Sequence, residues 1–374
     1  MPWTASHPRI GAVGLQSTRA SKALSRLGSA LVPLLMLTGL SGAAMAQAAD
    51  VLKVTASWNL PNTEEGIRQA VGKAKELGFN AYAFTGFHRS AILADECRKQ
   101  GMFGIRVIEP LRKQPGARLQ VIEKGEETWP GFVPVGSDAL YQYGGEPLPR
   151  HPEMCDRELV CPRDAGVVEY TVSEVRKASA NGFGGVCWDF LGYRNYHSCA
   201  CADCLAALAE YQAKHPDLPA DQAKAAFYED GLVDLYAKLY AATKELDPKM
   251  TVLSHVLPPY LPNLFYGRRV RVDYCAMTVC WFFQPHWPLD QVTERTRIAV
   301  QGPYADSGTI GMPMIGYYNS GSMAGHRRSA ERVAQELQIV AEQGAKSVMI
   351  CELGDILADP AVSEAVRKGL AAIR

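Results

Sequence analysis

The segment Gly184–Tyr193, GGVCWDFLGY, carries the side chain that this sequence most clearly offers for chemistry. It has the composition of a short buried strand that ends in an acid, Asp189. The chain then enters a loop with three closely spaced thiols, Cys199, Cys201 and Cys204. An ionisable group at the carboxyl end of a strand, beneath a long loop, is where α/β barrels hold their reactive residues. Asp189 is therefore the first candidate for a catalytic carboxylate.

Two further acids occupy similar predicted positions. Glu109 ends the third strand-like run and precedes Pro110, whereas Glu352 ends the eighth. Hydrolysis of a glycosidic bond needs two carboxyl groups, one ionised and one able to carry a proton. Asp189 could form this pair with Glu352, across a barrel, or with Glu109. Each acid could instead bind a backbone amide or an arginine and brace the fold.

Aromatic and polar side chains accompany these acids at the predicted strand ends. Indole faces stack on the apolar faces of sugars, and amides and carboxylates bind hydroxyl groups, so the mixture predicts a carbohydrate ligand. For the two histidines we expect a hydrogen-bonded structural role or a contact with substrate. The predicted substrate-binding residues are Trp58, Asn59, His88, Trp188, Tyr193, His255, Trp281, Tyr317 and Asn319.

The three thiols after Asp189 predict a structural site. Thiols two residues apart have poor geometry for a disulfide, and a structural zinc ion would need a fourth ligand. Cys155, Cys161 or His197 could provide it. A disulfide between the two loops, with Cys155 and Cys161 as partners, explains the same residues in an oxidising compartment. Either arrangement would hold together the two loops that follow the third and fourth predicted strands. No cofactor is expected to be required for catalysis.

Strand-like and helix-like runs alternate regularly along the chain. Eight such units predict the α/β class and a single (β/α)8 TIM barrel, with long insertions after strands 3 and 4. A doubly wound sheet would place a glycine-rich loop after the first strand, and none occurs there. The predicted strands are Val51–Asn59, Phe79–Phe84, a run from Phe103 to near Glu109, Gly184–Tyr193, Met250–Leu257, Val272–Phe282, Met312–Asn319 and Lys346–Gly354.

The N-terminus predicts export. Residues 1–46 hold four basic side chains and no acid, followed by the apolar run Ala30–Leu40 and the small-x-small sequence Ala44-Met45-Ala46. This pattern is typical of a secretory signal peptide, and the apolar run is short for a stable membrane anchor. The prediction is a secreted or periplasmic protein whose barrel domain comprises residues 47–374. Its 35 basic and 39 acidic residues give no reason to expect nucleic acid as a partner.

Three segments together resemble a known group of barrels. They are VCPRDAGVVEYTVSEVRKA from Val160, GFGGVCWDFLGYRN from Gly182 and CACADCLAALAEY from Cys199. The pattern resembles the hypothetical glycosyl hydrolases and, more distantly, β-galactosidases and α-L-fucosidases. The resemblance implies that Asp189 matches the nucleophile or its structural equivalent. It also implies that the cysteines match a metal or loop-bracing site of the β-galactosidases. In contrast to some relatives, no acid ends the sixth predicted strand.

The expected function is therefore an exported glycoside hydrolase of carbohydrate metabolism. One alternative is a barrel that binds glycans without cleaving them. A less favoured alternative is a metal-dependent hydrolase that uses His88, Glu109, Asp189 and His255, although the His-x-His pair common at such strand ends is missing.

Overall fold

The computed structural model describes residues 51–58, 61, 63–85, 89–123, 157–195, 198–256, 269–280, 286–301, 308–320, 325 and 327–374, and the backbone of 142–143 and 146–147. The predicted signal peptide lies outside these residues, as does most of the predicted insertion after the third strand. The extent of that insertion therefore stays a prediction.

Eight parallel strands close into a barrel in the order β1-β10-β9-β8-β7-β6-β3-β2. This confirms the predicted TIM barrel, whose first to eighth strands are β1, β2, β3, β6, β7, β8, β9 and β10. A separate antiparallel pair, β4 (Gln142–Tyr143) and β5 (Glu146–Pro147), belongs to the insertion. The barrel strands are β1 Lys53–Ser57, β2 Ala81–Phe84, β3 Phe103–Ile108, β6 Gly185–Trp188, β7 Thr251–Val256, β8 Tyr274–Thr278, β9 Ile310–Gly316 and β10 Val348–Cys351.

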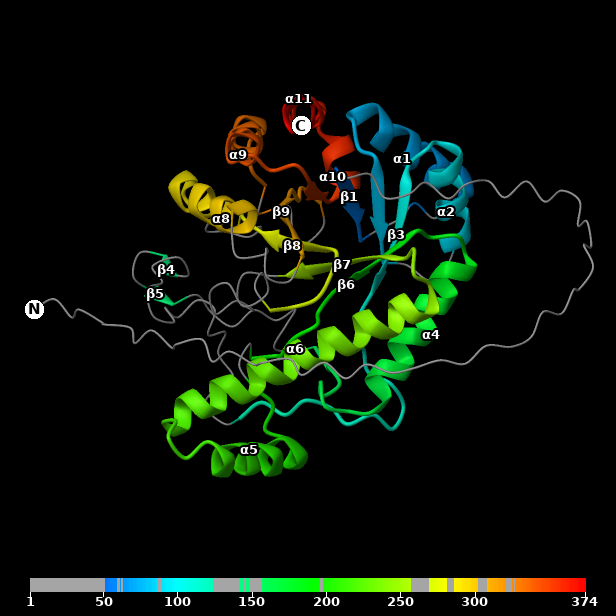
Figure 1. The fold of residues 1–374 in the computed structure, drawn as a ribbon. Helices are drawn as coiled ribbons and strands as arrows, with labels where there is room; N and C mark the ends of the chain where they lie inside the picture. Colours follow the sequence, from blue (N-terminus) through cyan, green and yellow to red (C-terminus); the bar gives the residue numbers. More distant parts are fainter. Residues whose placement is uncertain are drawn as a thin grey trace, which may run out of the picture. The chain divides into compact units, whose positions relative to one another are not determined.

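The helices lie around the strands (Figure 1). The first has clear local causes: the Thr63 side chain accepts a hydrogen bond from the Gly66 N–H at its start, and Gly78, at φ 100°, ends it in the left-handed conformation. The helices are α1 Glu64–Leu77, α2 Ser90–Lys99, α4 Gly166–Ala180, α5 Ala202–Lys214, α6 Ala220–Leu246, α8 Leu289–Gln301, α9 Ala330–Glu342, α10 Leu353–Ala358 and α11 Pro360–Ala372.

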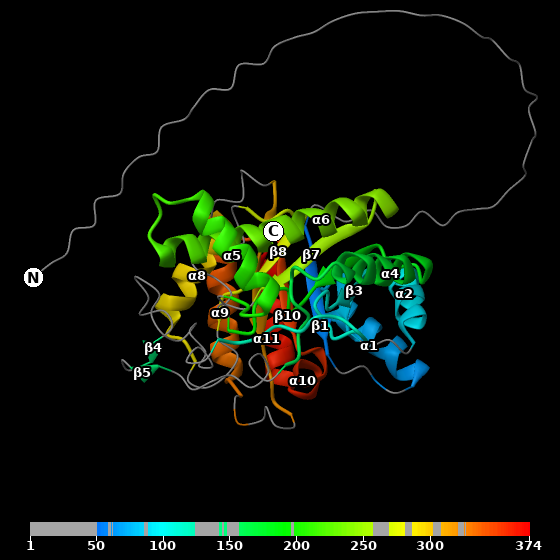
Figure 2. The ribbon, with the colours of Figure 1, turned by 90° about the horizontal axis from the view of Figure 1, so that it is seen from below.

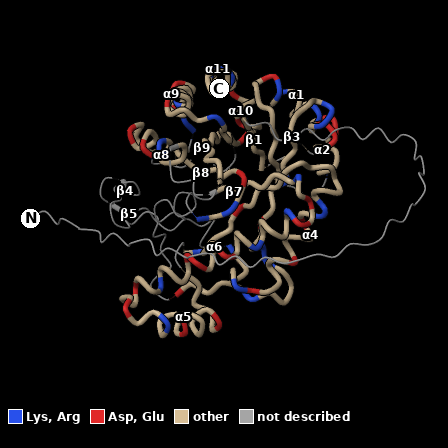
Figure 3. The backbone as a smooth tube through the Cα atoms, in the orientation of Figure 1, with Lys and Arg blue, Asp and Glu red and all other residues tan. Residues whose placement is uncertain are grey.

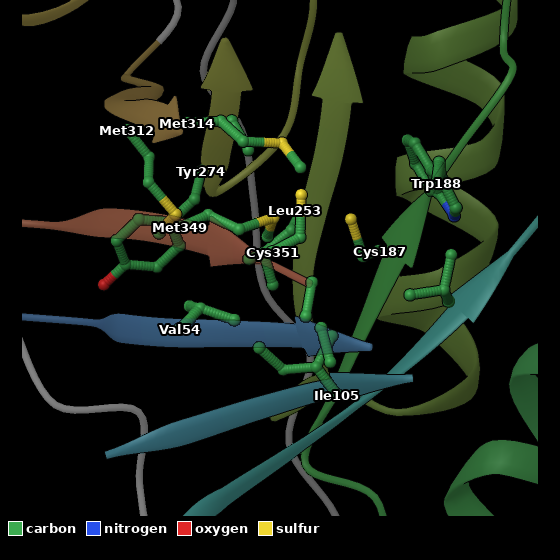
Figure 4. Close-up of a cluster of buried hydrophobic side chains, with 14 of the residues drawn as sticks. Val54, Ile105, Cys187, Trp188, Leu253, Tyr274, Met312, Met314, Met349 and Cys351 are labelled. Carbon is green, nitrogen blue, oxygen red and sulfur yellow. The ribbon is translucent and has the colours of Figure 1, made fainter. Parts of the chain in front are cut away.

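The barrel interior is filled by alternate residues of the strands. Cys187 and Leu253 point to the centre, whereas Trp188 lies on the other side of β6, beside a helix (Figure 4). All four residues of β6 are buried because helices cover the outside of the barrel. Further inward side chains shown there are Val54, Ile105, Met312, Met314, Met349 and Cys351. This alternation decides which residues reach the mouth of the barrel.

Two helices follow the loop after β6. Helix α5 begins at Ala202 and carries Cys204 in its first turn, and α6 begins at Ala220. Both views place α5 beside the N-terminal half of α6 (Figures 1 and 2). The two helices form a hairpin within the predicted insertion after the fourth strand, and Cys201 and Cys204 lie at the N-terminal end of α5.

Charged residues of both signs alternate over the outer helices (Figure 3). Among the described residues, no helix combines the length and the apolar character needed to cross a bilayer.

Candidate active site and cysteine cluster

Several barrel strands bring an inward-facing side chain to the mouth of the barrel at their carboxyl ends. Because residues alternate along a strand, the residue that follows an inward one by two positions shares its face. Asp189 therefore follows Cys187 onto the inner face, and His255 follows Leu253. This inner face continues to Trp58 after β1, Glu109 after β3, Asp189 after β6, His255 on β7, Thr278 on β8 and Tyr318 after β9. Glu352 follows the inward-facing Cys351 by one position and joins this group through its hydrogen bond to the Trp58 N–H.

Asp189 is held by hydrogen bonds at one of its two carboxylate oxygens. Its Oδ1 accepts hydrogen bonds from the Phe190 N–H at 2.9 Å and from His255 Nδ1 at 3.1 Å. The residue is 5% exposed. No described residue donates a hydrogen bond to Oδ2. One carboxylate oxygen is thus held, while the other is left for a ligand.

Glu109 lies beside Asp189. Strands β3 and β6 pair Ile108 with Trp188, and the Asp189 N–H donates to the Ile108 carbonyl at 2.9 Å. Both oxygens of Glu109 lie 3.0 Å from Arg157 Nη1. Burial raises the pKa of Glu109; the Arg157 guanidinium opposes this shift, and the Asp189 charge adds to it. Glu109 therefore keeps a proton to higher pH than an ordinary glutamate.

Glu352 is engaged by the protein itself. Its Oε1 accepts from Ser57 Oγ at 2.7 Å and from the Gly354 N–H at 3.3 Å, and its Oε2 accepts from the Trp58 N–H at 2.7 Å. It also caps helix α10. Burial raises the pKa of Glu352, and these donors oppose the shift. The carboxyl group ties the end of β1 to α10, the bracing arrangement that the sequence left open.

Trp58 and His255 meet over the mouth. Their rings stack with centroids 6.2 Å apart and an angle of 23°. The Trp58 Nε1–H donates to Tyr318 Oη at 2.9 Å, and His255 Nε2 lies 3.4 Å from Thr278 Oγ1. Tyr318 and Thr278 were missed by sequence reasoning. The alternation of β8 and β9 was the signal that could have identified them.

Three aromatic residues predicted to bind substrate lie in packed layers away from the mouth. Trp188 is fully buried and meets Tyr236 of α6 edge to face at 5.8 Å. Tyr193 is buried, with its hydroxyl donating to the Tyr228 carbonyl. Tyr317 is buried and donates to Asp359 at the start of α11. Their side chains are enclosed by protein, so we leave all three out of the proposed binding site.

The remaining predicted site residues form two groups, one inside and one outside the described part of the chain. Asn319 is partly exposed, and its N–H donates to Asp355 Oδ2 at 2.8 Å. Asn59, His88 and Trp281, together with Cys155 and His197, lie outside the described residues. Arg157, a residue that the sequence analysis did not consider, contacts the site twice. Besides binding Glu109, its guanidinium lies 3.7 Å from the centre of the Phe190 ring.

Four buried cysteines form a compact cluster beside the barrel. The ligand atoms of Cys161, Cys199, Cys201 and Cys204 all lie within 4.8 Å of one another. The Cys161 sulfur is 3.4 Å from that of Cys204 and 3.8 Å from that of Cys201. Sulfurs bound tetrahedrally to zinc at 2.3 Å would lie about 3.8 Å apart, whereas a disulfide requires about 2.05 Å. The thiols are unbridged, and their spacing fits a zinc ion.

Hydrogen bonds from the segment after β3 hold Cys161 and the loop after β6 in place. The Cys161 N–H donates to the Arg118 carbonyl at 2.7 Å. The Gln120 amide donates to the Gly192 carbonyl at 2.9 Å, and its oxygen accepts from the Arg194 N–H. Hydrogen bonds from Cys199 and Cys204, and a weaker one from Arg118, lower the pKa of Cys161. Such a thiolate is the form that binds metal.

Comparisons with known proteins agree with this architecture. The glycoside hydrolase domain of PgaB (BpsB) from Bordetella bronchiseptica has a TM-score of 0.54 and 13% identity, over 86% of this chain and 99% of that one. The fold is that of glycoside-hydrolase barrels. A cold-adapted β-galactosidase from Rahnella sp. R3 has a TM-score of 0.57 and 11% identity, over 88% of this chain and 57% of that one. No family model and no curated protein matches the sequence.

These comparisons confirm the predicted resemblance to glycoside-hydrolase barrels at the level of the fold. At such identities they leave the activity to be argued from the residues of the mouth.

Proposed function

We propose that this protein hydrolyses glycosidic bonds with Asp189 and Glu109 as its reacting carboxyl groups. The observation that carries the proposal is their adjacency. They follow the paired strands β3 and β6 at the same level, and the charge of Asp189 acts on Glu109. Neighbouring parallel strands lie about 4.8 Å apart. Two inward carboxyl groups at this spacing can both reach one glycosidic bond.

The two groups differ in the way the reaction requires. Asp189 accepts two hydrogen bonds on Oδ1, which hold the carboxyl group in place. Glu109 has a raised pKa and is the proton carrier. An oxocarbenium-like transition state needs both a negative group and a proton donor. Asp189 supplies the negative charge, and Glu109 protonates the leaving oxygen. The ion pair between Arg157 and Glu109 must then break when the substrate binds.

Carbohydrate is the substrate class that the aromatic residues favour. Trp58 and Phe190 are partly exposed near the acids and offer flat apolar faces to a sugar ring. Glu352 takes a supporting role in this proposal, because its carboxyl group is already bound to Ser57, Trp58 and Gly354. We also propose export to the periplasm or the medium. N-terminal sequencing of the exported protein would then start at Gln47.

The direct experiment is a kinetic assay on aryl glycosides and oligosaccharides. We expect Asp189→Asn and Glu109→Gln each to lower kcat/KM by about 10³-fold or more, as expected for loss of a group that acts in the transition state. Asp217→Asn, at an exposed loop position, is the matched control. If the wild-type protein hydrolyses a substrate and Asp189→Asn hydrolyses it at the same rate, the proposal is refuted.

A glycan-binding barrel without hydrolysis is the second candidate. It is favoured by the ion pair between Arg157 and Glu109, which engages both oxygens of the proposed proton carrier. Calorimetric binding of oligosaccharides, with no release of reducing ends over long incubation, would select this function over hydrolysis.

We further propose that Cys161, Cys199, Cys201 and Cys204 hold a structural zinc ion. Their spacing supports this ligand set, and four thiolates complete the coordination shell. Metal analysis of the purified protein should find about one zinc per chain, and Cys161→Ser should lower this amount. Cys97→Ser, at a buried thiol of α2, is the control. Disulfides among these four residues in non-reducing mass spectrometry would contradict the proposal.

A further inference from the structure

The hydrogen bonds of His255 determine both the position of its ring and the nitrogen that carries the proton. Its Nδ1 lies 3.1 Å from Asp189 Oδ1, and its Nε2 lies 3.4 Å from Thr278 Oγ1. A carboxylate accepts hydrogen bonds and cannot donate one, so the proton of this contact belongs to Nδ1. In the neutral imidazole, Nε2 then accepts from the Thr278 hydroxyl. The two contacts together select the tautomer that is protonated on Nδ1.

The ring of His255 is also held by Trp58, which is itself fixed by two hydrogen bonds. Trp58 stacks on one face at 6.2 Å. Trp58 is fixed in turn through its N–H by Glu352 and through its indole by Tyr318. His255 itself is 7% exposed. A ring enclosed in this way cannot turn freely, so its Nδ1–H points steadily at Asp189.

From this arrangement we infer that His255 is the residue that aims Asp189, and that Oδ2 is the oxygen of Asp189 that reacts. The Phe190 N–H and the His255 Nδ1–H both occupy Oδ1. Oδ2 receives no hydrogen bond from the described residues. This inference rests on the proposed hydrolysis for the role of Oδ2, whereas the state of the histidine can be tested without turnover.

The same geometry separates His255 from a general acid or base. Its Nδ1 is committed to Asp189 and its Nε2 to Thr278, so neither nitrogen is left to exchange a proton with a substrate. His255 is a positioning residue in this account. A residue that only filled space would tolerate an apolar replacement, whereas one that aims a carboxylate needs a donor at the place of Nδ1.

Two variants distinguish these roles. In His255→Asn, the side-chain amide can place an N–H close to the position of Nδ1, whereas His255→Leu keeps a similar volume without a donor. We expect His255→Asn to retain kcat within about 10-fold, and His255→Leu to lose about 10²-fold or more. KM should change little in both. Equal losses of kcat in the two folded variants would overturn the inference.

A spectroscopic measurement tests the tautomer directly. Long-range ¹H–¹⁵N spectra of the labelled protein distinguish the two neutral forms of a histidine, and His255→Asn identifies the signal. We expect the form protonated on Nδ1 in the wild-type protein. In Thr278→Val we expect the same form, because the Asp189 carboxylate still accepts from Nδ1. A wild-type histidine protonated on Nε2 alone would refute the inference. Absence of hydrolysis would instead refute the proposed function and leave this readout intact.

Discussion

The indole of Trp58 and the imidazole of His255 stack across the mouth of the barrel, with their centroids 6.2 Å apart. Strands β1 and β7, which carry them, lie on opposite sides of the ring of eight. The pair therefore links two carboxyl groups: Glu352 binds the backbone of Trp58, and His255 binds Asp189. The described part of the mouth is a connected polar network on an apolar interior.

Tyr318 supports this network, and removing its hydroxyl should be measurable. In Tyr318→Phe the Trp58 Nε1–H loses its acceptor in a partly buried place. An unsatisfied donor costs about 1–3 kcal/mol, which is the loss of unfolding free energy that we expect in urea denaturation. Tyr240→Phe, whose hydroxyl donates to Asp273 on the outside of the barrel, is the comparison. A Tyr318→Phe variant as stable and as active as the wild type would contradict the network.

Arg157 sets the pH dependence of the proposed proton carrier. Its guanidinium opposes the rise that burial produces in the pKa of Glu109. Arg157→Ala therefore raises this pKa further, and Glu109 stays protonated to higher pH. We expect the alkaline limb of the kcat/KM profile to move to higher pH, because it reports the loss of that proton.

Arg157→Lys, which keeps the charge, should move the limb less, and Lys113→Ala should leave it in place, since Lys113 pairs with the exposed Glu158. A shift of the alkaline limb to lower pH in Arg157→Ala would exclude Glu109 as the proton donor.

Glu352 should behave as a brace in both kinetics and stability. Glu352→Gln keeps one oxygen to accept from the Trp58 N–H, and its NH2 group can donate to Ser57 Oγ, so we expect a loss in kcat of less than about 10-fold. Glu352→Ala leaves these buried donors unpaired and should cost about 1–3 kcal/mol of unfolding free energy. A loss with Glu352→Gln as large as that with Asp189→Asn would restore Glu352 as a catalytic partner.

The raised pKa of Glu352 also has a consequence for stability. The folded state holds this proton more tightly than the unfolded chain. The contribution of the group is therefore most favourable below its ordinary pKa, and it declines as the pH rises through the folded-state value. Glu352→Gln removes this decline. Urea titrations of both proteins across this pH range measure the difference.

Removing zinc should destabilise the loops that surround the mouth. If the ion binds only the folded chain, its loss removes about 4 kcal/mol at a free concentration 1,000-fold above Kd. This corresponds to a fall in Tm of roughly 6 °C for a domain of this size. Calorimetry with a strong chelator, followed by zinc addition, measures it. An unchanged Tm after proven metal loss would argue against a structural role.

The sequence predicted the barrel well because the strands are apolar runs with covered faces, and because some helices, such as α1 and α9, begin at a side-chain cap. It also placed Asp189 and Glu109 at the ends of their strands, where the structure has them, while their catalytic role stays a proposal. It failed for Trp188, which was placed at the mouth together with its neighbour Asp189. Successive residues of a strand face opposite ways, so only one of the two can point inward.

Other features depend on the register of the chain, which a single sequence does not fix. Tyr317 and Tyr318 differ by one position, and only the structure shows that Tyr318 contacts Trp58 while Tyr317 binds Asp359. The choice of Cys161 as the fourth thiol depends on the pairing of Leu119 with Val160 across the insertion. Such long-range contacts leave no local pattern.

Chemical rescue tests the central claim most directly. Asp189→Gly removes the proposed reacting carboxylate and leaves space at Oδ2, where formate or azide can bind. We predict that this variant loses about 10³-fold or more in kcat on an aryl glycoside, and that either anion restores at least about 10-fold. The anions should have no such effect on Glu352→Gln. Full activity of Asp189→Gly without any added anion would contradict the account.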